Sequence, residues 1–369
     1  MSSRTPRQAV VFSGSGCGSV DAYGVGVVKA LAENRALPGT PAFAPSIYSG
    51  SAFGAFNAAV MVADAGGGVA QTIRRLEEAW LDGISSAAER PNGVYRMRGV
   101  SSFDPRAWMA NPLSAFLDTA KDAAYLAEDF AARVRSHFAA SDTSGVLERV
   151  IDVFSATPLF DMSPLQATLG AHVDLASVRA SEKALMVNAT DWEGGIGRIF
   201  TNRDMTDAQG YKILQASAAY LLVFPFVEID GRPFGGGPGS LATPLRPVVD
   251  AWAPRSEHLI VHAIYMHPPM PDVPIGKMPG MFSGIGRYFD MVESLNERAA
   301  VEYGPGQTPP AGDGHHGRVT IHRYRPSSPI VDWIDTIDFD RAKTEAFIAQ
   351  GYVDAHNHDC RAAGCADPS

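Results

Sequence analysis

Short apolar runs and helical patterns alternate along most of the chain. Residues 9–12 form an apolar run, and a glycine-rich stretch followed by an Ala/Val/Leu pattern continues from it to Leu31. This order predicts a strand, a loop and a helix. A second apolar run begins at Ile47 and passes through closely spaced glycines into an Ala-rich segment that reaches Ala63. We therefore expect a second strand, a sharp turn and a second helix.

The pattern becomes helical between residues 71 and 140, where apolar side chains recur at helical spacing. Strand-like runs return later and alternate with helices. These runs cover residues 184–188, 198–201, 227–229 and 258–265. Such alternation predicts an α/β fold, a three-layer α/β/α sandwich with a mainly parallel central sheet and a helical insert that covers the sheet edge.

The length of 369 residues suffices for one large domain. We expect this α/β domain to span residues 9–355, with the helical insert at about 70–180. Short tails are expected at residues 1–8 and 356–369.

Charge, apolar run length and cysteine content limit which partners and which cellular compartment we expect. The net charge is -9, and Lys and Arg form no run of the kind that binds nucleic-acid phosphates. No apolar run approaches the roughly 20 residues that span a bilayer. The three cysteines, Cys17, Cys360 and Cys365, are too few for a disulfide framework and suit a reducing compartment. We expect a cytoplasmic protein with no transmembrane segment and no nucleic-acid partner.

Three segments occur in an order that is informative about function. Residues 13–31 read SGSGCGSVDAYGVGVVKAL, and residues 47–59 read IYSGSAFGAFNAA. The third segment ends at Leu245 and reads FPFVEIDGRPFGGGPGSLATPL. In this order they resemble the Gly-rich loop, the GxSxG nucleophile elbow and the DGG-to-NTPL segment of patatin-like phospholipases. The resemblance covers roughly residues 9–265 and implies a patatin-like fold with serine–aspartate acyl hydrolysis and no cofactor.

The nucleophile position of the family is altered. The segment from Gly54 to Ala58 matches the family's GAxNA closely, so the elbow begins at Gly50 and Ala52 stands at its apex. A methyl group cannot attack a carbonyl. The neighbouring Ser51 could replace the apex residue only after a one-residue shift in register.

The carboxylate position is altered as well. When the TPL sequence that ends at Leu245 is aligned with the family's NTPL, Gly236 falls where the resemblance implies the catalytic aspartate. Asp230 is a candidate stand-in. However, an Asp-Gly pair such as Asp230-Gly231 is typical of a hairpin turn, which is the favoured interpretation.

The loop that should stabilise an oxyanion is also changed. Alignment from the following helix makes Gly16, Cys17 and Gly18 the loop residues and puts Asp21 on its last glycine. Asp21 could cap the helix that follows it, or it could supply a resident carboxylate that repels an oxyanion. Cys17 could be a reactive thiol in this loop or an inert small residue. If the family's pocket is retained, the resemblance implies that the following residues line it: Gly16, Gly18, Ser19, Tyr23, Gly50, Phe53 and Gly54.

The C-terminal segment contains side chains that bind metals in other proteins. They are Asp354, His356, His358, Asp359, Cys360 and Cys365. Their spacing fits no zinc pattern with two well-separated pairs, so a solvated tail without metal is the favoured interpretation.

These observations leave several functions open. The leading hypothesis is a patatin-like protein that keeps a pocket for an acyl, lipid-like or other apolar ligand but does not hydrolyse it. A second is a repurposed enzyme that performs acid/base chemistry on an acyl- or polyketide-derived metabolite. A lipid acyl hydrolase inactivated at Ala52 and a pure protein-interaction module are the remaining alternatives.

Overall fold

The computed structural model describes most of the chain. The described residues are 6–14, 18–34, 41–63, 66–87, 90–98, 112–139, 160–220, 223–236, 243–252, 258–266, 291, 319–327, 337–363 and 365.

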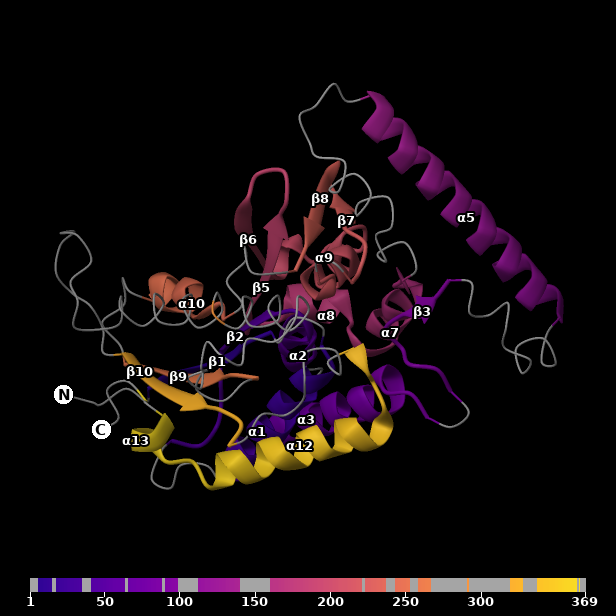
Figure 1. Ribbon diagram of the computed structural model, residues 1–369. Coiled ribbons are helices and arrows are strands. Elements are labelled where there is room, and N and C mark those ends of the chain that lie inside the picture. The colour runs from indigo at the N-terminus through magenta and orange to yellow at the C-terminus, as the bar shows by residue number, and fades with distance from the viewer. Residues whose placement is uncertain are drawn as a thin grey trace, which may run out of the picture.

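The centre of the molecule is an eight-stranded sheet (Figure 1). Its strand order is β10 (Val319–Tyr324), β9 (Leu259–Ile264), β1 (Arg7–Phe12), β2 (Ile47–Ser51), β5 (Ala184–Asp191), β8 (Arg232–Gly235) and β7 (Val227–Ile229), with β6 (Ile196–Thr201) also pairing with β5. The strands from β10 to β5 are parallel, whereas β6, β8 and β7 pair in antiparallel fashion. The mainly parallel sheet expected from the sequence is confirmed.

The sheet is buried on both faces because apolar side chains point alternately to its two sides. In β1, Val10 and Phe12 belong to one core cluster, and Ala9 and Val11 belong to the other. The first cluster includes residues of α1 (Tyr23–Ala32), α2 (Phe53–Val62) and α12 (Arg341–His356), and the second includes residues of α10 (Leu245–Trp252). Helices therefore cover both faces, which confirms the three-layer α/β/α arrangement.

The remaining helices and strands lie between and after these elements along the chain. They are η1 (Ser19–Ala22), α3 (Val69–Glu78), η2 (Ala79–Ile84), β3 (Arg96–Met97), α5 (Pro112–Ala139), β4 (Phe160–Asp161), α7 (Ser163–His172), α8 (Leu175–Ala180), η5 (Asn202–Asp204), α9 (Gly210–Ala218) and α13 (Cys360–Ala363).

Two helices of the segment predicted as a helical insert, α3 and α5, lie in different surroundings. Helix α3 packs against both α1 and α2, so it belongs to the helical layer over the sheet rather than to a cover on the sheet edge. Helix α5 runs along the outside of the molecule in Figure 1 and is tied to β3 by Arg96, which pairs with Asp122 at 2.9 Å.

Of the described helices, none is both long enough and apolar enough to cross a membrane.

Both predicted tails take part in regular structure. Strand β1 begins at Arg7, two residues before the expected domain boundary. Gln8 is buried, and its side-chain amide donates to the carbonyl of Ala42 at 2.8 Å. At the other end, α12 continues to His356 and α13 follows within the segment expected to be a tail.

Candidate functional site

The turn between β2 and α2 has the geometry of a nucleophile elbow. Strand β2 ends at Ser51 and α2 begins at Phe53, so Ala52 alone makes the turn. Its φ of 52° and ψ of -132° are unusual for a residue with a Cβ atom, and such a conformation stores about 1–3 kcal/mol. Ala52 therefore occupies a strained position at the turn from strand to helix.

The two glycines of the elbow allow its close packing. A Cβ atom at Gly50 would collide with the backbone oxygen of Gly54. A Cβ atom at Gly54 would lie 2.7 Å from the carbonyl oxygen of Phe12 in β1. The absence of side chains at these positions thus lets α2 fold back on β2 and against β1.

A glycine outside the predicted site residues also lies against the apex. Gly14 follows β1, and a Cβ atom there would lie 2.7 Å from both the Cβ of Ala52 and the backbone oxygen of Ser51. The alignment with the family that starts from the following helix assigns the loop to the later glycines Gly16 and Gly18. Gly14 instead comes two residues after the end of β1.

Ser217 connects the nucleophile position with the carboxylate position. The Ala52 N–H donates to Ser217 Oγ at 3.0 Å, and that hydroxyl donates to the carbonyl of Asn188 at 2.6 Å. Gly236 lies against the same residue, because a Cβ atom at Gly236 would be 2.5 Å from the Ser217 carbonyl oxygen. The structure therefore brings Ala52 and Gly236 together around Ser217, a residue whose role the sequence did not reveal.

Asp21 places its carboxylate at the beginning of α2. It is fully buried in η1, and its Oδ2 accepts a hydrogen bond from the Gly54 N–H at 3.2 Å. Its backbone oxygen accepts another from the side-chain amide of Asn57 at 3.0 Å. The interpretation of Asp21 as the cap of its own helix is wrong, because neither η1 nor α1 has a side-chain cap. The carboxylate instead interacts with the positive end of the neighbouring helix.

Comparison with known proteins identifies the family. A family model described as patatin-like phospholipase matches residues 10–250. The chain belongs to the patatin-like phospholipase family. Among solved structures, VipD from Legionella pneumophila is 13% identical with a TM-score of 0.35, and the alignment covers 94% of this chain and 67% of VipD. The type III effector protein ExoU is 13% identical with a TM-score of 0.30, and the alignment covers 98% of this chain and 54% of ExoU. A search among curated proteins found no match.

Substitution of Asp21 tests what the carboxylate contributes to this patatin-like elbow. We expect Asp21→Ala to reduce the free energy of unfolding by about 1–3 kcal/mol, because the buried Gly54 N–H loses its acceptor. Asp21→Asn keeps an acceptor oxygen of the same reach and should lose less. Urea unfolding of both variants measures the difference. Equal stability of Asp21→Ala and the parent chain would exclude this structural role.

Three further residues that the family pattern assigned to the pocket lie within the protein core. The Phe53 ring packs against Trp80 and Phe339, with ring centroids 5.8 and 5.5 Å away, and it also fills the space beside Gly18. Tyr23 is fully buried and packs against α12. Burial and the nearby Asp354 carboxylate raise the pKa of Tyr23, so its hydroxyl stays protonated. Ser19 is fully buried in η1.

Asp230 does not approach the elbow. It forms the turn between β7 and β8 with Gly231, and their φ values are 51° and 76°. The hairpin interpretation of this pair is confirmed. Asp230 is exposed, accepts a hydrogen bond from Gln209, and lies at the opposite end of β8 from Gly236.

Ser51 is buried at the end of β2. Side chains two residues apart on a strand share a face, so Ser51 lies on the side of Ser49, whose hydroxyl donates to the Pro244 carbonyl at 3.2 Å. Two other candidates, Gly16 and Cys17, lie outside the described residues.

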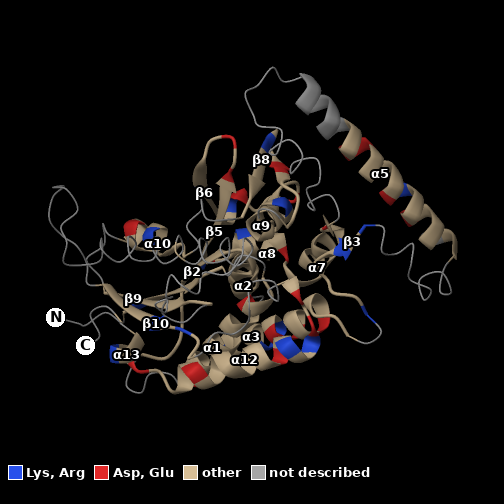
Figure 2. Cartoon of the chain, in the orientation of Figure 1, with Lys and Arg blue, Asp and Glu red and all other residues tan. Residues whose placement is uncertain are grey.

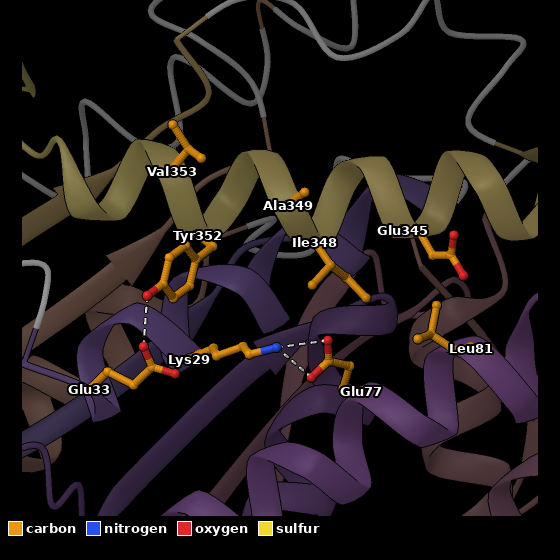
Figure 3. Close-up of a pocket in the computed structure, with 9 residues that line it drawn as sticks. All are labelled: Lys29, Glu33, Glu77, Leu81, Glu345, Ile348, Ala349, Tyr352 and Val353. Atoms are coloured by element: carbon orange, nitrogen blue, oxygen red, sulfur yellow. Dashed lines mark hydrogen bonds and ion pairs between the residues drawn. The ribbon is translucent and has the colours of Figure 1, made fainter.

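A groove of about 420 Å³ lies elsewhere, between α12 and the helices α1 and α3 (Figure 3). Lys29 pairs with Glu77 at 2.9 Å, and the Tyr352 hydroxyl donates to Glu33 at 2.7 Å. Acidic and basic residues also lie side by side on α3 and α12 in Figure 2. The charged side chains of this groove pair with one another, and none of the residues that line it belongs to the elbow.

Among the described residues, one group could hold a metal ion. It consists of His322, His358, Cys360 and Cys365. Three of these were candidates from the sequence, but His322 was not, because it lies far away along the chain. The group includes a residue of β10, which is three strands from β2 in the sheet order, so it is separate from the elbow.

Proposed function

We propose that this patatin-like protein binds an acyl, lipid-like or other apolar ligand at the family's site without serine hydrolysis. The observation that carries the proposal is Ala52 at the strained apex between β2 and α2. Hydrolysis by this family's chemistry requires an activated nucleophile at that point. A methyl group supplies neither a nucleophile nor a proton to transfer.

The surroundings of Gly236 support the loss of the second catalytic group. The chain contains no Asp or Glu between Asp230 and Asp250, so a neighbouring carboxylate in this segment cannot compensate. A Cβ atom at Gly236 would also lie 2.5 Å from the Ser217 carbonyl oxygen, which is backbone and cannot simply rotate away. This crowding argues against the alternative of an ordinary hydrolase inactivated by a single substitution at Ala52.

The chemical character of the site favours an apolar ligand. Gly14, Ala52 and Gly236 are small and uncharged, and they meet around the elbow and Ser217. The nearby Asp21 carboxylate is buried and accepts the Gly54 N–H. Binding sites for apolar small molecules have largely uncharged linings with a small number of polar groups. The uncharged Gly14, Ala52 and Gly236, with the Ser217 hydroxyl beside them, are compatible with such a lining.

The alternative of a repurposed acid/base enzyme receives less support. Among its candidate groups, Asp21 interacts with the start of α2, and Tyr23 packs against α12 with a raised pKa. Ser51 and Cys17 remain candidates from the sequence. A role as a protein-interaction module also remains open as a hypothesis.

Activity-based labelling tests the absence of serine hydrolysis. We expect no hydrolysis of short-chain esters or phospholipids by the parent chain, and no labelling by a fluorophosphonate probe, which reacts with activated serines. A patatin-like hydrolase with its serine and aspartate intact serves as the positive control. Hydrolysis of phospholipid by the parent chain would overturn the proposal, and its loss in Ser51→Ala would then assign the activity to Ser51.

Ligand binding needs a separate measurement. Organic extraction of the purified, tag-free chain followed by mass spectrometry should identify a co-purified acyl or apolar molecule. A separate, folded sample of the protein should bind a fluorescent fatty acid, and an unlabelled fatty acid should displace it. Absence of both a co-purified molecule and fatty-acid or phospholipid binding would contradict the ligand-binding part of the proposal.

A further inference from the structure

Four side chains from two distant parts of the chain meet at the edge of the described sheet. His322 belongs to β10, His358 follows α12, Cys360 begins α13, and Cys365 comes shortly after it. One ligand atom from each residue lies within 4.8 Å of the other three. The sequence favoured a solvated tail here, whereas the structure packs this segment against β10.

The distances within the group are those of a metal-binding site. Cys360 Sγ is 3.5 Å from His322 Nδ1 and 3.5 Å from His358 Nε2, and Cys365 Sγ is 3.3 Å from His358 Nε2. Zinc binds thiolate sulfur at about 2.3 Å and imidazole nitrogen at about 2.0–2.1 Å, so neighbouring atoms of a tetrahedral set lie roughly 3.3–3.8 Å apart. All three distances fall within that range.

We propose that His322, His358, Cys360 and Cys365 bind one Zn²⁺ ion in a tetrahedral structural site. Two sulfur and two imidazole ligands form a set that suits zinc, whereas magnesium and calcium prefer oxygen. Four protein ligands complete the coordination and leave no position for water or substrate. The two thiols lose their protons to solvent when the metal binds.

The local backbone holds the two cysteines in place. The Cys365 N–H donates to the Cys360 carbonyl at 2.9 Å, which closes the short α13 turn and brings both sulfurs to one side. The backbone N–H of Arg323, next to His322 in β10, donates to Cys365 Sγ at 3.3 Å. Such second-layer hydrogen bonds orient metal ligands and favour the thiolate.

The position of the site indicates a structural role. Strand β10 is at one end of the sheet order, and α12 packs along α1 over the sheet. A metal that joins β10 to the end of α12 would fasten the C-terminal segment to this edge of the sheet. The inference is independent of the proposed ligand site, because the elbow residue Ala52 follows β2, three strands away.

Metal analysis of the tag-free protein tests the assignment. We expect about one zinc ion per chain after growth in zinc-containing medium, and loss of that zinc in Cys360→Ser, Cys365→Ser and His358→Ala. His356→Ala is the matched histidine control, since His356 is exposed and lies outside the group. Cys17→Ser is the cysteine control. Both controls should keep the full zinc content.

Measurements on the parent chain keep the test valid if a ligand variant does not fold. Cobalt(II) substituted for zinc should give the visible bands of a tetrahedral site and thiolate-to-cobalt charge transfer. A strong chelator should lower the Tm by several degrees, and added zinc should restore it. The proposal is overturned if the parent chain binds no zinc in a titration, if Cys360→Ser/Cys365→Ser retains the metal, or if the protein isolated under reducing conditions contains a Cys360–Cys365 disulfide.

Discussion

Gly26→Ala is expected to lower the free energy of unfolding by about 3 kcal/mol or more, because α1 and α12 pack with almost no space between their backbones. A Cβ atom at Gly26 would collide with the Ile348 carbonyl and lie 2.6 Å from the Tyr352 nitrogen. Gly351 of α12 faces the Tyr23 carbonyl in the same way. Both obstacles are backbone atoms, so relief requires one helix to shift.

Intrinsic helix propensity predicts the opposite sign for this substitution. Alanine is more favourable than glycine inside a helix by about 1 kcal/mol, which is smaller than the expected effect of the collision. Gly170→Ala provides the matched control, because Gly170 is exposed in α7 and a Cβ atom there would meet no heavy atom within 4 Å. This variant should be stabilised by up to about 1 kcal/mol. Urea unfolding measures both variants, and an unchanged or increased stability of Gly26→Ala would contradict the close helix contact.

Asn57→Ala is expected to destabilise the protein by about 3 kcal/mol, since it removes two buried hydrogen bonds at once. Asn57 is fully buried in α2. Its Oδ1 accepts from the Trp80 indole N–H at 2.7 Å, and its Nδ2 donates to the Asp21 backbone oxygen at 3.0 Å. The substitution thus leaves the backbone oxygen of Asp21 in η1 and the indole N–H of Trp80 in η2 without this partner inside the core.

A double-mutant cycle separates the hydrogen bond from the change in packing. Asn57→Leu leaves the Trp80 N–H buried without its acceptor, whereas Trp80→Phe removes that donor. The double variant should therefore lose less stability than the two single variants together. Equilibrium unfolding of the four proteins measures the coupling free energy, and strict additivity would show that the Asn57–Trp80 hydrogen bond contributes nothing.

The residues that match the family motifs thus have structural functions around the elbow. Asn57 joins α2 to η1 and η2, and Gly50 and Gly54 allow the close elbow. None of these contacts involves a catalytic hydroxyl or carboxylate. The scaffold can therefore fold with Ala52 and Gly236, which is consistent with a patatin-like protein whose site has another use.

Much of the architecture could be predicted from local patterns. The apolar run at residues 9–12 became β1, because a strand that is buried on both faces is apolar at successive positions. The glycine spacing around Ala52 predicted the elbow, because a tight turn excludes side chains at fixed positions. The Asp230-Gly231 turn was predicted for the same kind of local reason.

The sequence by itself determined which chemical groups are present at the elbow, because a residue at a recognised position either carries a hydroxyl or carboxylate or does not. Only the tertiary structure decided which groups meet. Asp21 reaches Gly54 across 33 positions, and Cys360 reaches His322 across 38. The pairing of parallel strands and the packing of helices create such contacts, and neither leaves a spacing pattern between the partners. For this reason the sequence was enough to identify Ala52 as the elbow residue. The contact of the Asp21 carboxylate with the start of α2 and the proposed zinc site could be recognised only in the tertiary structure.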